Sequence, residues 1–238
     1  MDTISANAQS LLFYDRTGLW WGASAVSERD RTRAATIDAV GPGPLQVLEL
    51  GAGFGGAAAA TADLGHSVVA IERSRVRAAF ARRQVWTERV GELAVLEADF
   101  NELELDQSFD VIAYWSGFGA ADDEAQSMLL ARIARWLRPR GHVFIDVFDP
   151  RWWAAAHGST REMSRFVQCL RFDAGSSRCS ITYWPRHDPT STITETIRCY
   201  VLDEFAAMAL QAGLAPVSNI DVQRAQAPSY LVELKASS

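Results

Sequence analysis

The sequence predicts an α/β fold built on a doubly wound, mainly parallel sheet with helices on both faces. Short apolar runs alternate with helical segments between residues 45 and 149, and a glycine-rich turn follows the first run directly. Apolar runs of this length between helices are typical of parallel strands buried on both sides. Such alternation of strands and helices is typical of a doubly wound sheet.

Five strands and three helices are expected in this core. The strands are LQVLEL (45–50), SVVAIE (67–72), LAVLEAD (93–99), FDVIAYW (109–115) and HVFIDVFD (142–149). The helices are GGAAAATADLG (55–65), SRVRAAFARRQVWTERVG (74–91) and DDEAQSMLLARIARWLRPRG (122–141). The third helix opens on acidic residues, which stabilise a helix N-terminus.

The flanking regions are expected to differ from the core. Residues 1–40 read as helical with a break at RTGLWWG (16–22), and GPGP (41–44) ends that region. Three segments separated by turn residues read as antiparallel strands, namely FVQCLRF (166–172), RCSITYW (178–184) and TITETIRCY (192–200). The chain closes with a helix, LDEFAAMALQAGL (202–214), and short strands near 217–222 and 229–235.

Composition narrows the class of protein. The 238 residues are 48% hydrophobic and 22% charged, as in an ordinary globular protein. A net charge of −6 argues against a nucleic-acid or anionic-membrane surface, which needs basic patches. Three scattered cysteines without metal spacing predict free thiols in a reducing compartment and no metal site. The N-terminus lacks a signal-peptide pattern and no run is long enough to span a membrane, so a cytoplasmic location is expected.

The turn after the first strand fits two cofactor signatures. The segment ELGAGFGG (49–56) contains G-x-G-x-x-G, the nicotinamide dinucleotide pattern, and Glu72 ends the next strand where an acid binds a ribose. The same segment also reads E-x-G-x-G-x-G, beginning at Glu49. The glycines alone therefore leave both a nicotinamide dinucleotide and S-adenosylmethionine open.

Two acidic positions favour S-adenosylmethionine. An acid at Glu49, directly before the turn, suits a ligand with an ammonium group and repels a pyrophosphate. Asp99 ends the third strand and can accept a hydrogen bond from the adenine amine. The Phe100 amide can donate to an adenine ring nitrogen, and its ring can lie against the base. The final helix and two strands supply the antiparallel hairpin expected at one sheet edge.

These residues give the chain its likeness: it resembles a class I S-adenosylmethionine-dependent methyltransferase of the small-molecule branch. Residues 45–149 carry the resemblance, and CYVLDEFAAMALQAGLAP (199–216) extends it. SGFGA (116–120) and RCYVLDEF (198–205) are similar to phrases of that branch. LRPRG (137–141) differs from the usual LRPGG only by Arg140. No NPPY or DPPF phrase occurs, which weakens the base- and amide-methylating branches.

The resemblance implies a single methyltransferase domain over 1–238. It implies a seven-stranded Rossmann-like sheet of order 3-2-1-4-5-7-6 in which the last-numbered strand is antiparallel. A helical lid is expected at 1–40, the cofactor-binding core at 41–160, an antiparallel β insertion over the active site at 161–200, and the closing helix and hairpin at 201–238. The cofactor-binding residues implied are Tyr14, Trp20, Glu49, Gly51, Ala52, Gly53, Gly55, Glu72, Arg73, Asp99, Phe100 and Trp115.

The acceptor side is defined less sharply. An aromatic face on the lid can stabilise a sulfonium by cation–π attraction, and Tyr14 is favoured because its hydroxyl needs a polar partner. The substrate candidates are Trp21, Ser116, Tyr183 and Arg198, of which Arg198 can hold a carboxylate. Tyr14, His187 and Tyr200 are the catalytic candidates, the last two as proton acceptors. For each of these side chains, packing on the core or an exposed strand face is the alternative.

The predicted function is methyl transfer from S-adenosylmethionine to a nitrogen or oxygen of a small metabolite, as in secondary metabolism. The alternatives are a protein that binds this cofactor for another purpose, and a nicotinamide-dependent oxidoreductase. The expected partner is a small-molecule methyl acceptor rather than a nucleic acid or a membrane, and the sequence is compatible with a homodimer.

Overall fold

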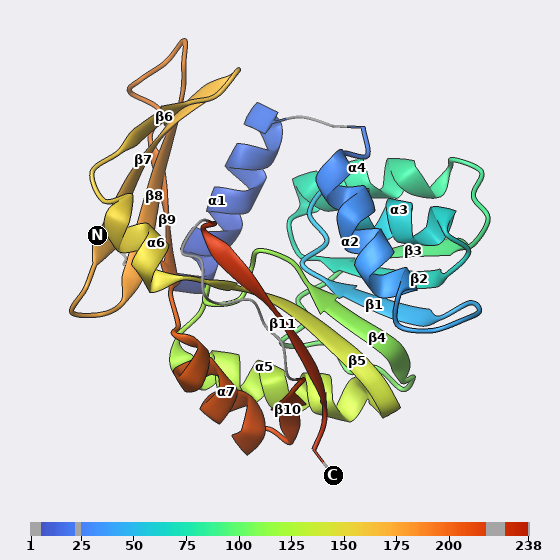
Figure 1. Cartoon of the computed structure of the whole chain (residues 1–238). Helices are drawn as coiled ribbons and strands as arrows, with labels where there is room; N and C mark the ends of the chain where they lie inside the picture. Colours follow the sequence, from blue (N-terminus) through green and yellow to red (C-terminus); the bar gives the residue numbers. More distant parts are fainter. Residues whose placement is uncertain (1–5, 22–24, 218–226, 238) are drawn as a thin grey trace.

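The computed structural model of the chain describes residues 6–21, 25–217 and 227–237. Its main element is a seven-stranded sheet (Figure 1). The strands run in the order β3 (Glu92–Glu97), β2 (Ser67–Glu72), β1 (Gln46–Leu50), β4 (Phe109–Tyr114), β5 (Leu137–Phe148), β11 (Ser229–Ala236) and β10 (Leu214–Pro216). Strands β1 to β5 are parallel, and β11 is antiparallel to both of its neighbours. The predicted order 3-2-1-4-5-7-6, with the last-numbered strand antiparallel, is confirmed.

Helices cover both faces of this sheet because its central strands are apolar on both sides. On one face, Leu48 and Leu50 pack with side chains of α5 (Asp123–Trp136) and α7 (Leu202–Gln211). On the other, Val47 packs with α2 (Glu28–Asp38) and α3 (Gly56–Asp63). The alternation of strand residues places Glu49 on the same face as Val47, toward α2.

A second, four-stranded antiparallel sheet lies beside the carboxyl ends of the main strands. Its order is β6 (Thr160–Glu162), β7 (Phe166–Asp173), β8 (Arg178–Pro185) and β9 (Ile193–Arg198). Helix α1 (Ala6–Trp21) lies between this sheet and α4 (Arg75–Val85), as Figure 1 shows. Phe13 of α1 and Trp153 of α6 (Pro150–Ala155) join the apolar core of the second sheet.

Some element boundaries differ from the expectations. Helix α1 continues through Gly18 to Trp21, where a break was predicted. A Cβ at Gly18 would lie 3.1 Å from Val76 and 3.2 Å from Arg77, so the glycine serves the close packing of α1 on α4. Helix α4 ends at Val85, and α6 and β6 were not predicted. The strand expected near 217–222 falls mostly outside the described residues, and β10 lies just before it.

The LRPRG segment belongs to β5 rather than to the end of a helix. The register of β4 and β5 shifts between Phe109 and Val111, so one strand carries an irregularity there. Arg140 has a φ of +67°, in the left-handed region that favours glycine. The replacement of the usual glycine therefore leaves a strained arginine in this part of β5.

We expect Arg140→Gly to stabilise the protein by roughly 0.5–1 kcal/mol. The left-handed conformation costs a residue with a Cβ about 1–2 kcal/mol, and the added flexibility of glycine in the unfolded chain offsets part of the gain. Denaturant unfolding measures the difference. Arg140→Ala, which removes the charge but keeps the Cβ, should give no such gain; equal stabilisation by both would show that strain is not the cause.

Candidate active site

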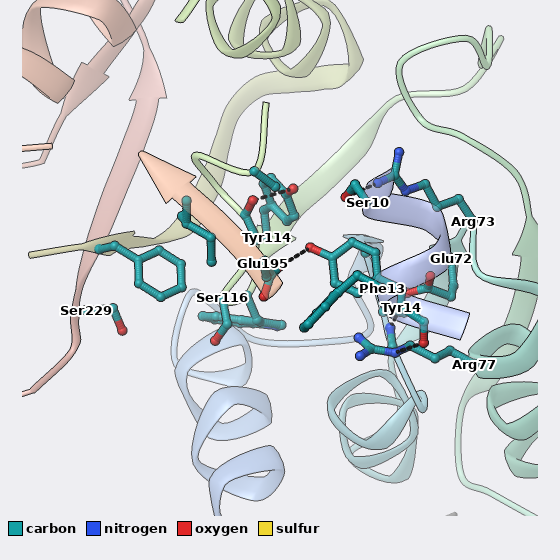
Figure 2. A pocket seen from close by; sticks show the side chains of 18 of the residues that line it. Ser10, Phe13, Tyr14, Glu72, Arg73, Arg77, Tyr114, Ser116, Glu195 and Ser229 are labelled. Atoms are coloured by element: carbon teal, nitrogen blue, oxygen red, sulfur yellow. Dashed lines mark hydrogen bonds between the residues drawn. The ribbon is translucent and has the colours of Figure 1, made fainter. Parts of the chain in front are cut away.

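A large cavity opens at the carboxyl ends of β1, β2 and β4. Its volume is about 920 Å³, near the upper end of the roughly 300–1,000 Å³ that ligand pockets span. One part is lined by the turn after β1 and the neighbouring strand ends, and the other by α1, α6 and β7 to β9. Open α/β sheets bind ligands at this edge, so we take this cavity as the candidate active site (Figure 2).

The glycine-rich turn exposes its backbone to the cavity. Gly51 and Gly53 have φ values of +60° and +57°. A Cβ at Gly51 would lie 3.2 Å from the Tyr114 ring, whereas one at Gly53 would meet no protein atom within 4 Å. Gly51, Ala52 and Gly53 line the cavity, and Gly55 does not. A Cβ at Gly55 would lie 2.9 Å from that of Ala81, so Gly55 serves the packing of α3 on α4 and not the cavity.

Glu49 is a buried acid with an unsatisfied oxygen. The residue is 3% exposed, and its Oε2 atom accepts no hydrogen bond from the part of the chain that is described. Burial raises the pKa of Glu49 to about 8, although the nearby Arg33 lowers it. A cationic group in the cavity would supply the missing partner and favour the ionised carboxylate.

Glu72 at the end of β2 is held in one orientation by the backbone. The amides of Gly53 and Ser74 each donate to one of its carboxylate oxygens at 2.7 Å. Burial raises the pKa of Glu72, and these hydrogen bonds lower it. Each oxygen keeps a further lone pair, so the carboxylate can still accept two hydroxyl groups of a ligand.

Asp99 and Phe100 follow β3 and close the same end of the cavity. Asp99 Oδ1 accepts from the backbone and side-chain amides of Asn101, and its Oδ2 lies 3.6 Å from Arg73 Nη1. Phe100 is 9% exposed and packs edge-on against the Tyr114 ring at 5.4 Å. The structure thus brings Glu49, Glu72, Asp99 and Phe100 together at one end.

Helix α1 covers the cavity and is fastened to the N-terminal part of α4. Arg77 Nη2 donates to Thr17 Oγ1 at 2.8 Å, and its guanidinium carbon lies 4.7 Å from the Tyr14 ring centre and 4.9 Å from that of Trp21. Ser74 Oγ donates to Asp15 Oδ1 at 2.6 Å. The Tyr14 hydroxyl donates to Glu195 Oε1 at 2.5 Å, which joins α1 to β9 (Figure 2).

The part of the cavity under the small sheet is mostly aromatic and apolar. Its lining includes Phe13, Tyr14, Trp21, Phe148, Trp152, Trp153, Leu170, Ile181, Tyr183 and Ile197. Glu195, Gln168 and Arg161 are the polar side chains that the small sheet adds to this lining among the described residues. Such a compartment suits an organic ligand with few polar groups.

Trp115 and Ser116 lie where the two parts of the cavity meet. Arg33 of α2 donates to Ser116 Oγ and to Asp146 Oδ2, both at 2.8 Å. Its guanidinium carbon lies 5.1 Å from the Trp115 ring centre, and Trp115 Nε1 is buried without a hydrogen-bond partner in the described chain. Ser116 has a φ of +58°, so the backbone after β4 turns sharply here.

Four side chains predicted for the site lie outside the cavity, besides Gly55. His187 is exposed between β8 and β9. Arg198 pairs with Asp123 and Glu204, because strand alternation puts it on the face of β9 opposite Glu195. Tyr200 is fully buried, and its hydroxyl donates to Asp123 Oδ1 at 2.7 Å. The Trp20 ring lies 5.7 Å from the Arg16 guanidinium rather than in the site.

Sequence reasoning missed Glu195, Arg33, Arg77 and Tyr114, all of which line the cavity. Glu195 had a detectable signal: in ITETIR it stands between two isoleucines at strand spacing, so an acid shares an apolar strand face. Arg33 and Arg77 sit on helices rich in charged residues, where no local pattern distinguishes them.

No group of histidine, cysteine and acidic residues suited to a metal ion occurs in the described ranges. Every helix within those ranges is too short or too polar to cross a bilayer.

Part of the chain is similar in sequence to known proteins. Residues 47–141 match the protein family described as a methyltransferase domain. The cypemycin N-terminal methyltransferase of a Streptomyces species is 34% identical over 120 residues, which are 50% of this chain and 48% of that protein. The chain thus matches about half the length of this curated relative.

Solved structures share the fold over most of the chain. The CcbJ methyltransferase from Streptomyces caelestis has a TM-score of 0.75 at 21% identity, and the match covers 87% of this chain and 95% of that one. An S-adenosylmethionine-bound amino pentose methyltransferase from Micromonospora echinaspora has a TM-score of 0.68 at 15% identity, with both chains fully covered. At these identities the likeness shows the fold.

We expect Arg77→Met to loosen α1 from the rest of the chain. The buried guanidinium makes hydrogen bonds to Thr17 and to the Tyr14 carbonyl, so its loss should lower the free energy of unfolding by about 1–3 kcal/mol. Limited proteolysis should also cut within α1 faster. Arg75→Met on the exposed side of α4 is the matched control. Similar behaviour of the two variants would contradict the fastening role.

Proposed function

We propose that the chain transfers a methyl group from S-adenosylmethionine to a nitrogen or oxygen of a small metabolite. It has the fold of the class I S-adenosylmethionine-dependent methyltransferases, and residues 47–141 match a methyltransferase domain. The observation that carries the proposal is one continuous cavity with two unlike parts. Carboxylates and bare backbone line the part at the strand ends, and aromatic rings line the part under the small sheet. A polar donor and a mostly apolar acceptor would thus share one enclosed space.

The residues at the strand ends fit S-adenosylmethionine. Glu49, with its unsatisfied oxygen, would face the ammonium group of the donor. Glu72, already oriented by two amides, would accept the ribose hydroxyls. Asp99 and Phe100 would hold the adenine, and the open space beside Gly53 would admit the ligand against the backbone. When bound, this donor supplies a methyl group activated by a sulfonium.

The contribution of the chain is mainly to align the reactants and to exclude water. Orientation of two reactants can supply up to roughly 7–11 kcal/mol of a reaction barrier in ideal cases. Helix α1, fastened through Arg77 and Tyr14, covers the cavity, and the aromatic lining keeps water from the acceptor. This chemistry needs no protein nucleophile, in accord with the mainly apolar lining under the small sheet.

The relatives support the substrate class. Their names describe an N-terminal methyltransferase for cypemycin and an amino pentose methyltransferase involved in calicheamicin biosynthesis. CcbJ also comes from a Streptomyces species. These likenesses favour a natural-product acceptor and a nitrogen atom over an oxygen atom.

We expect Glu72→Ala to weaken S-adenosylmethionine binding at least about tenfold, because hydrogen bonds to a charged group contribute about 1.5–3 kcal/mol each. Isothermal titration calorimetry measures the affinity, and thermal unfolding verifies that the variant folds. Glu88→Ala removes an equal charge from an exposed position and should bind normally. An unchanged affinity in Glu72→Ala would remove this residue from the cofactor site.

We expect binding of S-adenosylmethionine to release protons when the pH lies below about 8. Free Glu49 has a pKa of about 8, and a bound ammonium group favours its ionised form. The affinity should therefore rise with pH up to about 7.7, above which the ligand's own amino group loses its charge. Calorimetry in buffers of different ionisation enthalpy detects the released protons. Glu49→Gln should abolish this dependence; persistence of it would place the titration elsewhere.

The same pKa shift has a consequence for stability. The folded state of the free protein binds more protons at Glu49 than the unfolded state between the model-peptide pKa of 4.5 and about 8. The contribution of Glu49 to the free energy of unfolding therefore falls as the pH rises through this interval. Glu49→Gln should flatten that part of the profile, which denaturant unfolding at several pH values measures. A profile that keeps its slope in the variant would contradict the shifted pKa.

A further inference from the structure

We propose that Glu195 receives the methyl acceptor as an ammonium ion, and that the enzyme is accordingly an N-methyltransferase acting on a small amine. The inference rests on the proposed methyl transfer and adds to it the chemical class of the acceptor and the residue that recognises it. It is drawn from the position of one carboxylate in the part of the cavity under the small sheet, where most lining side chains are aromatic or apolar and the small sheet adds only Gln168 and Arg161 as further polar side chains among the described residues.

The register of the small sheet aims Glu195 into the cavity. Glu195 on β9 pairs with Ile181 on β8, and Ile181 pairs with Leu170 on β7, so these three side chains share one face. All three line the cavity, as does Ile197, two residues along β9. On this face of β7 to β9 the other residues are apolar, aromatic or, at Gln168, neutral. Glu195 is partly buried there, so it loses part of its hydration, and this loss is costly unless a ligand compensates for it.

Only one oxygen of Glu195 has a partner among the described residues. The Tyr14 hydroxyl donates to Oε1 at 2.5 Å, and no ion pair within 4.0 Å involves Glu195 in the described chain. Arg77 is the nearest cation by its electrostatic effect, but its hydrogen bonds go to Thr17 and to the Tyr14 carbonyl. The second oxygen is therefore available to an acceptor.

The surroundings of Glu195 suit a cation. The rings of Phe13 and Trp21 lie 5.5 and 5.9 Å from that of Tyr183, and the Tyr14 ring lies 5.3 Å from that of Phe13. All four rings line the cavity. An ammonium ion over the face of an aromatic ring gains about 0.5–1 kcal/mol at an exposed site and about 2 kcal/mol when desolvated. The Arg77 guanidinium already lies against Tyr14 and Trp21, so Phe13 and Tyr183 are the rings that remain for this contact. An alcohol could donate a hydrogen bond to the carboxylate, but it would gain neither this attraction nor the ion pair.

The carboxylate can also take the proton that the reaction requires. Burial raises the pKa of Glu195, while the Tyr14 hydrogen bond, Arg77 and Arg73 lower it. Burial, and to a lesser extent Glu195, raises the pKa values of the Tyr114 and Tyr183 phenols, so they stay neutral. The pKa of the Cys179 thiol is raised by its hydrogen bond with Cys199, by burial and by Glu195, so it stays neutral too. Burial and Glu195 also raise the pKa of Tyr14, which therefore remains the hydrogen-bond donor of this pair.

The step balances without a further reagent. The ammonium ion transfers one proton to Glu195, which gives a neutral amine and a carboxylic acid. The amine lone pair then forms a bond to the methyl carbon as the carbon–sulfur bond breaks. The electrons of that bond stay on sulfur, and S-adenosylhomocysteine is the leaving group. The product carries the positive charge as a methylated ammonium ion, and Glu195 returns its proton to water when the product departs.

The test compares benzylamine, which is an ammonium ion at neutral pH, with benzyl alcohol. Each is titrated calorimetrically into the protein saturated with S-adenosylhomocysteine. We expect the wild type to bind the amine more tightly than the alcohol. Glu195→Gln should weaken amine binding at least about tenfold, because it removes the ion pair and its charged hydrogen bond, and should weaken alcohol binding less, so that the preference for the amine is lost. Glu195→Asp, which keeps the charge, should recover part of the preference.

Controls separate this inference from the proposed function. Glu88→Gln makes the same substitution at an exposed position and should retain the full preference for the amine. Thermal unfolding verifies that each variant folds. Failure of every variant and the wild type to bind S-adenosylhomocysteine would contradict the proposed function itself. Normal binding of that ligand with no preference of the wild type for benzylamine, or with a preference that Glu195→Gln retains, overturns the role of Glu195 alone.

Discussion

The cavity depends on three carboxylates that are kept away from bulk water at defined positions. Glu72 satisfies both oxygens with backbone amides, Glu195 satisfies one with the Tyr14 hydroxyl, and Glu49 keeps one oxygen unpaired. Burial raises the pKa of all three. A buried acid without a full set of donors is costly to the free protein, and a cationic ligand lowers that cost. The unequal satisfaction of these acids thus indicates where positive charge binds.

Helix α1 links this electrostatic arrangement to the fold. It packs on α4 through Gly18, and Arg77 of α4 holds it by hydrogen bonds and by contact with aromatic rings. On its other side, Tyr14 reaches β9. The helix therefore joins the part of the cavity at the strand ends to the part under the small sheet. Since the same helix covers both parts, its position affects the two parts of the cavity together.

In the small sheet, the alternation of side chains along a strand decides which residues face the cavity. Residues two apart on β9 face the cavity, which places Glu195 and Ile197 there and turns Arg198 toward Asp123 and Glu204. The sequence predicts Arg198 as a substrate-binding residue, because arginine binds carboxylates well. Glu195, three residues earlier on the opposite face of the strand, is the charged group that β9 brings to the cavity. An odd number of residues along a strand thus separates a structural ion pair from a cavity residue.

The sequence by itself determined the doubly wound sheet and the group of acids at one end of the cavity. Those features follow from local patterns: apolar runs of strand length, glycines that permit positive φ, and acids at strand ends that meet at one edge of a parallel sheet. The strand order was implied by the resemblance to a known family and not by these patterns. Only the tertiary structure decided that Gly55 packs on Ala81, that Tyr200 bonds to Asp123, and that Tyr14 meets Glu195 from 181 residues away. These contacts join segments distant in the chain, and no periodicity within either segment encodes which partner it will meet.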